Sequence, residues 1–262
     1  PHRPPVLGPG DVTHAEQVPQ LEAAFGGGQP GNAPAKNLAG VSAPTAVEVF
    51  IHDKPGAPQS VVLAAQLIPP TANPDEVAVE TMNTVLGGAF ISRINMNLRE
   101  DKHWSYGARS FAWDAAGQRP FVVYAAVQTD KTAESLQEIR NEIEAIRGPR
   151  PVTEDELTKA VDNITLSLPG NWETINSVSG SLSEIVRFGL PDDHFDTSAD
   201  AIRSVSADDA SAVARQFLDP DRMVWVVVGD RAEIEDKIRD LGFGDVRILT
   251  VDPDPEPIAM AN

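Results

Sequence analysis

Leu86-Gly87-Gly88-Ala89-Phe90-Ile91-Ser92-Arg93-Ile94 is the stretch that decides how the middle of this 262-residue chain folds. Upstream of it, Val79, Met82 and Leu86 recur at helical spacing, which predicts a helix with one apolar face. The two glycines end that pattern, and a helix C-cap with a positive φ accounts for them. A second helix is expected over about residues 90 to 99.

On either side of this stretch, the hydrophobic pattern predicts strands. Residues 47–51 alternate between apolar and other side chains, as expected of an edge strand, whereas residues 61–68 are almost continuously apolar, as expected of a buried strand. Asn73 then supplies an N-cap before a proline and two acids, which predicts the start of the first helix. Two more strands are expected near residues 104–113 and 120–128.

The second half of the chain has mainly helical patterns. Residues 136–146 carry one apolar stripe, and Thr153 to Glu156 form a capping box for the following helix. Several glutamates lie off that stripe and are expected to face solvent, namely Glu134, Glu138, Glu142 and Glu144. The other expected elements are helices over 175–188 and 207–218, a strand over 223–228, a short helix and a last strand near 246–251.

This order of elements predicts an α+β fold. Strands that follow each other across short turns imply antiparallel pairing, and grouped helices imply a layer on one face of the sheet. We expect a single two-layer domain, with a mixed, mostly antiparallel sheet and helices packed on one face. The domain is expected to span residues 46–251, after a Pro/Gly-rich linker or extension over 1–45 and before an acidic, Pro-rich tail over 252–262.

The composition argues against several classes of protein. A formal net charge of −18, from 39 acidic and 21 basic side chains, argues against nucleic-acid binding, which needs a basic surface. No apolar run approaches the roughly 20 residues of a membrane-spanning helix. Cysteine is absent, which excludes disulfides and thiolate chemistry and fits bacterial periplasm and cytoplasm equally well.

Arg99 and Tyr106 are the candidate site residues. Arg99 is expected at the end of a helix and Tyr106 at the start of a strand, so both side chains should lie at one end of the domain. However, an arginine at a helix C-terminus is favoured by the helix dipole, and a tyrosine is ordinary in a strand. Spacing alone therefore assigns no role to the pair.

A family resemblance does assign roles. The quoted stretch, followed by Leu98-Arg99-Glu100 and Trp104-Ser105-Tyr106-Gly107, resembles the second-half signature of the insulinase/pitrilysin family of zinc peptidases. The resemblance covers roughly residues 45–250. It implies that Arg99 and Tyr106 bind substrate and stabilise the oxyanion. Ser105 stands where the family often has glycine, which leaves this assignment in place.

The chain lacks the family's zinc motif, His-x-x-Glu-His. Its five histidines are too far apart for any two to be i, i+4 neighbours on one helix. The resemblance therefore implies the inactive half of a zinc endopeptidase, whose zinc lies in a partner subunit or an upstream domain that carries His-x-x-Glu-His. The isolated chain is expected to be inactive, and its peptide substrate is not revealed by the sequence.

The sequence bears on two other possible functions. Some relatives in this family are structural subunits that cut nothing, and a domain without the zinc motif fits such a role; the presence of Arg99 and Tyr106 argues against it. A self-sufficient hydrolase of another mechanism is disfavoured, because the sequence has no Gly-x-Ser-x-Gly elbow, no cysteine and no histidine cluster. His103, between the pair, is expected to be a surface or hydrogen-bonded residue and not a metal ligand.

Overall fold

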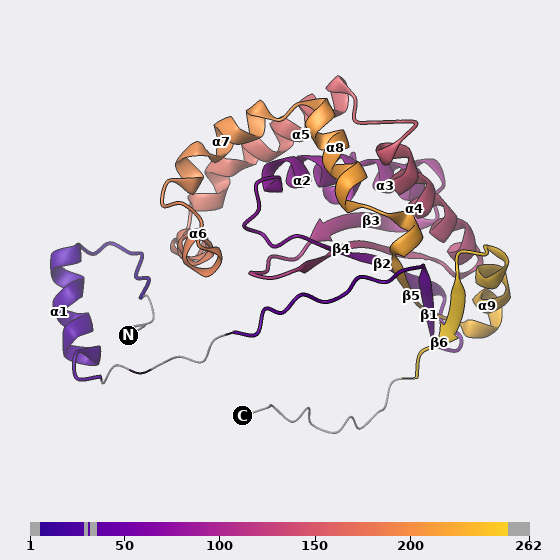
Figure 1. The fold of residues 1–262 in the computed structure, drawn as a ribbon, viewed down its shortest axis with the longest axis horizontal. Helices are drawn as coiled ribbons and strands as arrows, with labels where there is room; N and C mark the ends of the chain where they lie inside the picture. Colours follow the sequence, from indigo (N-terminus) through magenta and orange to yellow (C-terminus); the bar gives the residue numbers. More distant parts are fainter. Residues whose placement is uncertain (1–5, 29–30, 32–35, 251–262) are drawn as a thin grey trace.

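A six-stranded mixed sheet forms one layer of the molecule (Figure 1). The structure is a computed structural model that describes residues 6–28, 31 and 36–250. The strands are β1 (Glu48–Asp53), β2 (Gln59–Ile68), β3 (Ser105–Ala112), β4 (Arg119–Gln128), β5 (Val224–Gly229) and β6 (Asp245–Ile248).

The strand order across the sheet is β3-β4-β2-β5-β1-β6. The pairs β3–β4, β4–β2 and β2–β5 are antiparallel, whereas β1 runs parallel to both β5 and β6. The prediction of a mixed, mostly antiparallel sheet is therefore confirmed. β3, the strand that carries Tyr106, lies at one edge of the sheet.

The predictions about the first two strands need a correction. Residues 47–51 were expected at an edge of the sheet and, across a short turn, next to residues 61–68. Instead, β5 lies between β1 and β2, and β6 covers the other side of β1. Val49 and Ile51 are accordingly buried, at 1% and 0% exposure. The first two strands therefore do not pair with each other, because β5, from near the C-terminal end of the described chain, pairs with both of them.

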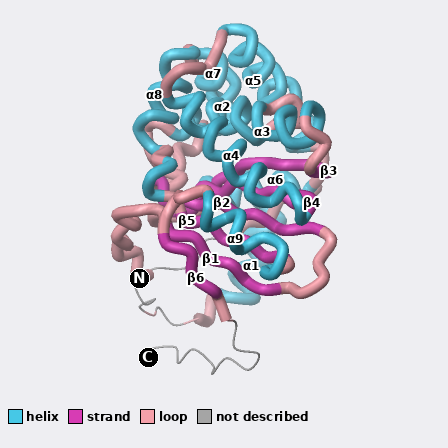
Figure 2. The backbone as a smooth tube through the Cα atoms, turned by 90° about the vertical axis from the view of Figure 1, so that its right-hand side faces the viewer, coloured by secondary structure: helices cyan, strands magenta, loops and turns pink. Residues whose placement is uncertain are grey.

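Helices cover one face of the sheet, as predicted (Figure 2). The α-helices from residue 76 onward are α2 (Glu76–Asn83), α3 (Arg93–Asn95), α4 (Thr132–Arg147), α5 (Glu154–Ser167), α6 (Ile175–Phe188), α7 (His194–Ser204), α8 (Ala207–Phe217) and α9 (Arg231–Asp240). Shorter turns are the π-helical η1 (Thr84–Gly88) and η2 (Met96–Asp101), and the 3-10 helices η3 (Thr129–Lys131), η4 (Leu168–Trp172) and η5 (Pro220–Arg222). The predicted element order contained no counterpart of α7.

The core lies between this helical layer and the sheet. The stripe of α4 is fully buried, as the sequence predicted. Alternate residues of β4 face it, because successive strand side chains point to opposite faces. Both sets have 0% exposure: Leu136, Ile139, Ile143, Ile146, Phe121, Val123, Ala125 and Val127.

The helix starts follow local capping chemistry. Thr153 and Glu156 form the predicted capping box of α5. The start of α2 differs from its prediction, because the helix begins at Glu76 and Asn73 lies three residues before it. Asn73 still organises this turn, since its Oδ1 accepts a hydrogen bond of 2.9 Å from the Asp75 backbone N–H.

Within residues 1–45, which the sequence predicts to be a linker or extension, lies a helix, α1 (His14–Phe25), which begins with a capping box between Thr13 and Glu16. None of its residues is buried, and in Figure 1 it lies apart from the sheet. The predicted tail over 252–262 lies outside the described residues. Among the residues that are described, no helix is long and apolar enough to cross a membrane.

Candidate functional site

The double glycine brings a helix end against the edge strand. Neither glycine has a positive φ, so the predicted C-cap explanation is wrong. Both lie in the π-helical turn η1, which ends α2. A Cβ on Gly87 would lie 2.5 Å from the Ser110 backbone nitrogen in β3 and 2.3 Å from its Oγ. Gly87 is therefore required by close contact between two chain segments, not by backbone conformation.

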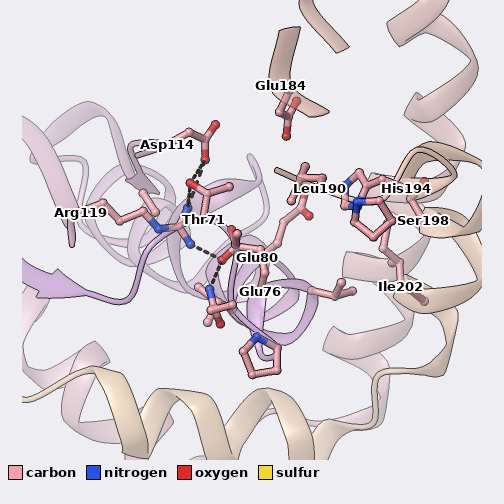
Figure 3. A pocket seen from close by; sticks show the side chains of 18 of the residues that line it. Thr71, Glu76, Glu80, Asp114, Arg119, Glu184, Leu190, His194, Ser198 and Ile202 are labelled. Carbon is pink, nitrogen blue, oxygen red and sulfur yellow. Dashed lines mark hydrogen bonds and ion pairs between the residues drawn. The ribbon is translucent and has the colours of Figure 1, made fainter. Parts of the chain in front are cut away.

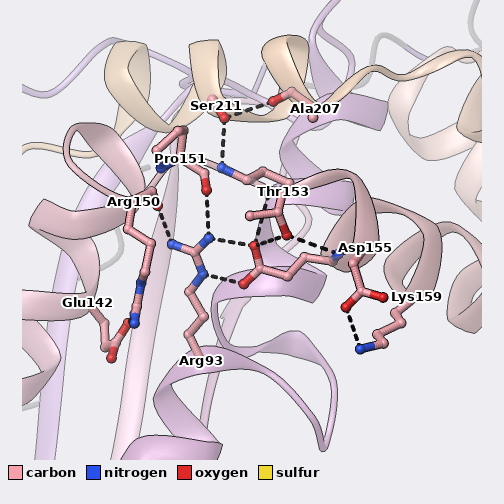
Figure 4. A network of polar contacts seen from close by, with 11 residues as sticks. Arg93, Glu142, Arg150, Pro151, Thr153, Asp155, Lys159, Ala207 and Ser211 are labelled. Carbon is pink, nitrogen blue, oxygen red and sulfur yellow. Dashed lines mark hydrogen bonds and ion pairs between the residues drawn. The ribbon is translucent and has the colours of Figure 1, made fainter.

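Arg93 anchors the segment that follows (Figure 4). Its guanidinium donates to both carboxylate oxygens of Glu156, at 2.7 and 2.6 Å, and to the carbonyls of Arg150 and Pro151, at 2.5 and 2.9 Å. The side chain is only 5% exposed. Partial burial by itself would raise the pKa of Glu156, but the hydrogen bonds from Arg93 and the Thr153 backbone lower it to about 2. Arg93 is thus a framework residue.

The next turn, η2, is held from its other side by α4. Asn97 donates from Nδ2 to Glu142 and Glu138, at 2.8 and 2.9 Å. Glu142 also pairs with Arg150 and is 6% exposed. The prediction that Glu142 faces solvent is therefore wrong, because polar partners from two other segments cover it. Through these contacts, the position of Arg99 within η2 is fixed on both sides.

Arg99 and Tyr106 come together, as the sequence predicted. The Arg99 Cζ lies 5.9 Å from the centroid of the Tyr106 ring and 4.6 Å from that of Phe90. Its Nε forms a 3.2 Å ion pair with Glu100. The guanidinium is thus steered by two aromatic faces and one neighbouring carboxylate, while the Arg99 side chain remains 37% exposed.

Tyr106 is presented to solvent on the edge strand, with 89% of its surface exposed. An irregularity in the β3–β4 pairing between Ser105 and Ala108 removes Tyr106 and Gly107 from the regular ladder. Asn95 stabilises this region, since its Oδ1 accepts from the Ala108 backbone N–H at 3.1 Å and its Nδ2 donates to the Phe90 carbonyl at 2.6 Å. Asn95 therefore joins the segments that carry the two aromatic rings.

His103 turns the chain between Arg99 and Tyr106. It has a φ of 58°, in the left-handed region that non-glycine residues rarely adopt. Its Nδ1 lies 3.0 Å from the Arg99 carbonyl, and its own carbonyl accepts from Gln128 Nε2 at 3.0 Å. These are hydrogen-bonding roles, of the kind that the sequence predicted for it.

The residues at this site do not fit a metal centre. Throughout residues 6–28, 31 and 36–250, no group of three or more histidine, cysteine, aspartate or glutamate side chains is arranged to hold a metal ion.

Sequence reasoning missed Phe90 and Asn95. Phe90 is 58% exposed and contacts Arg99 through its ring, whereas Asn95 is 4% exposed and acts through hydrogen bonds. Both lie in or next to the quoted stretch. An aromatic residue two positions after the glycines that end the first predicted helix was a usable signal for Phe90. Nothing in the sequence indicated that Asn95 would form a hydrogen bond with a strand residue thirteen positions away.

Comparisons with known proteins agree with this architecture. A family model described as the peptidase M16 inactive domain matches residues 4–164. An uncharacterized zinc protease of Streptomyces coelicolor is 28% identical over 222 residues, which are 81% of this chain and 47% of that protein.

Two solved structures share the fold at low sequence identity. One is the crystal structure of a peptidase M16 inactive domain from Pseudomonas fluorescens, with a TM-score of 0.72 and 22% identity, over 84% of this chain and 52% of that one. The other is a chain of complex III from Candida albicans, with a TM-score of 0.69 and 12% identity, over 88% of this chain and 56% of that one. The chain thus spans about half the length of the relatives that it matches.

Proposed function

The chain belongs to the family of peptidase M16 inactive domains, and on this premise we propose that it forms the substrate-binding half of a zinc endopeptidase. In this proposal, Arg99 and Tyr106 contact a peptide that lies between this domain and a homologous half carrying His-x-x-Glu-His. That half is a partner subunit or another part of a longer chain.

The observation that carries the proposal is the joint exposure of Arg99 and Tyr106. Their side chains lie side by side although seven positions separate them, and both remain accessible to solvent. By contrast, the Arg93 guanidinium donates its hydrogen bonds to groups within the domain. A rigid support beneath an accessible arginine and tyrosine is what a binding site for an incoming chain requires.

Each side chain supplies a distinct interaction. The Tyr106 hydroxyl can donate a hydrogen bond to a peptide carbonyl oxygen, and this bond strengthens when the oxygen gains negative charge. The Arg99 guanidinium keeps its proton and offers several donors in a fixed fork, which suits backbone carbonyls or a peptide carboxylate. Phe90 and Glu100 limit where that fork can point.

Zinc is assigned to the other half, since the described residues of this chain offer it no site. The isolated chain is accordingly expected to bind peptide without cutting it. A second role deserves a test, because a chain of complex III has the same fold. In that role the domain would be a structural subunit, and Arg99 and Tyr106 would have no substrate.

The test is peptide cleavage by this chain alone and by the native complex captured on it from extracts of the source cells. Each sample is assayed with and without a zinc chelator. We expect activity only in the captured complex, and loss of that activity with the chelator. A stable complex that cleaves none of a broad peptide library would favour the structural role, and activity of the isolated chain would contradict the proposal.

A further inference from the structure

The domain also has a cavity whose lining includes neither Arg99 nor Tyr106. We call it the α2–α7 cavity; it measures about 660 Å³ and is bounded by α2, by the end of β3 and by helices α6 and α7 (Figure 3). Its walls combine apolar side chains with carboxylates. The apolar lining residues include Val77, Leu190 and Ile202, and the carboxylates include Glu80, Asp114 and Glu184.

One arginine faces this cavity, and its charge is already balanced. Arg119 is 1% exposed and forms ion pairs with Glu76 and Asp114. Its remaining donors go to the Pro69 carbonyl, at 2.9 Å, and to the Thr71 hydroxyl, at 3.2 Å. Arg119 therefore shares its single positive charge between two carboxylates of the wall, which leaves this group with a net negative charge.

Glu80 and Glu184 are left without a cationic partner. No lysine or arginine in the described parts of the chain forms an ion pair with either of them. Glu80 is an exposed residue, but the protein atoms around its carboxyl partly desolvate it and raise its pKa, and the negative charges of Glu76, Glu184 and Asp114 raise that pKa further. Burial followed by the charge of Asp114 likewise raises the pKa of Glu184, against a smaller opposing effect of His194.

The geometry points to a lysine or arginine side chain of a peptide as the ligand of the α2–α7 cavity. The aliphatic stem of such a side chain would contact Val77, Leu190 and Ile202, and its charged end would lie between Glu80 and Glu184. Long basic side chains are suited to this division, because they bury an apolar stem while keeping a charged end near polar groups. The cavity thus offers apolar walls to the stem of such a side chain and carboxylates to its charged end.

A peptide is favoured over a free cation because of where the cavity lies. Phe111 and Ala112, at the end of edge strand β3, form part of its wall. An edge strand offers unpaired backbone groups to an extended peptide. This inference concerns binding only, so it holds whether or not Arg99 and Tyr106 take part in cleavage.

The test compares two capped hexapeptides that are alanine except for one central residue, arginine in one and citrulline in the other. Citrulline keeps the shape and loses the charge. Binding to the 262-residue chain is measured by calorimetry and by NMR shifts of the labelled protein. We expect the arginine peptide to bind at least about tenfold tighter, with shifts concentrated around Leu190 and Ile202.

Variants locate the effect. Glu80→Gln with Glu184→Gln should remove the preference for arginine, and Glu184→Gln alone should reduce it. The matched control is Asp162→Asn with Asp236→Asn, which removes the same charge from exposed positions of α5 and α9 and should keep the preference. Circular dichroism checks that each variant is folded.

Three results would overturn the inference: equal binding of the two peptides, shifts outside the cavity, or a preference that survives Glu80→Gln with Glu184→Gln. Binding of arginine amide as tight as that of the arginine peptide would also overturn it, since the ligand would then be a small cation and not a peptide.

Discussion

Arg93 and Arg99 lie six positions apart on the same short segment, yet their surroundings are opposite. Arg93 is 5% exposed and its guanidinium hydrogen bonds end on Glu156 and on two backbone carbonyls. Arg99 is 37% exposed and contacts aromatic faces and one exposed carboxylate, that of Glu100. The fold therefore depends on the first arginine, and the second is available for another molecule.

The largest effect on stability is expected from Arg93→Ala. This change leaves Glu156 Oε1 and the Arg150 and Pro151 carbonyls without the donor that Arg93 supplies. We expect the free energy of unfolding to fall by about 3 kcal/mol. Urea unfolding followed by circular dichroism measures it. A loss below about 0.5 kcal/mol would mean that Arg93 is as dispensable to the fold as a surface residue.

Gly87→Ala tests the close contact that positions this segment. The added Cβ would collide with the Ser110 backbone, so a loss of about 2 kcal/mol is expected from the forced displacement. Gly180→Ala in α6 is the matched control, because its Cβ would meet nothing within 4 Å. That control should stabilise the helix by roughly 0.5–1 kcal/mol. Equal effects of the two changes would refute the contact argument.

A fall in pH should reduce the contribution of the Arg93–Glu156 contact to stability, and this effect ranks third in size. The pKa of Glu156 is about 2 in the folded chain and near 4.5 otherwise, so its contribution is complete above about pH 4.5 and is lost as the pH falls toward 2. After allowance for its partial exposure, we expect a loss of roughly 1 to 2 kcal/mol. The measurement is urea unfolding from pH 7 to 3.

The control for this pH dependence is Glu156→Gln, which should lack that part of the pH response. The comparison with the variant is needed because desolvation raises the pKa values of Glu76, Glu80 and Glu184, and these groups favour the folded state as they become protonated. Identical pH curves for the two proteins would show that Glu156 is not the responsible group.

The smallest effect on stability is expected from Arg99→Ala. Exposed ion pairs and cation–π contacts contribute little, so the free energy of unfolding should change by less than about 0.5 kcal/mol. This experiment is the direct counterpart of Arg93→Ala and uses the same urea unfolding assay. A loss similar to that of Arg93→Ala would remove the contrast between the two arginines.

Sequence reasoning succeeded where local periodicity decides the structure. The helix of residues 175–188 and the stripe of α4 followed from apolar spacing, and the α5 capping box followed from two residue types three positions apart. It failed where distant segments meet. β5 entered between β1 and β2, the Gly87 contact involves Ser110, and Glu142 is covered by Asn97 and Arg150.

The candidate site shows the same division. The adjacency of Arg99 and Tyr106 was predictable, because a helix end and a strand start meet at one end of a two-layer domain. The role of Asn95 was not predictable. It depends on an irregularity in the β3–β4 pairing that no residue type in the sequence indicates. The α2–α7 cavity was equally hidden, because its two unpaired glutamates come from α2 and α6.

The most direct test is peptide turnover by the proposed assembly of this chain with a zinc-bearing half, with Tyr106→Phe in this chain. We expect turnover to fall on the order of 100-fold to 1000-fold, since one donor to the developing oxyanion is lost, with an unchanged urea midpoint for the chain. Unchanged turnover would contradict the account, because the exposed tyrosine would then have no part in the reaction.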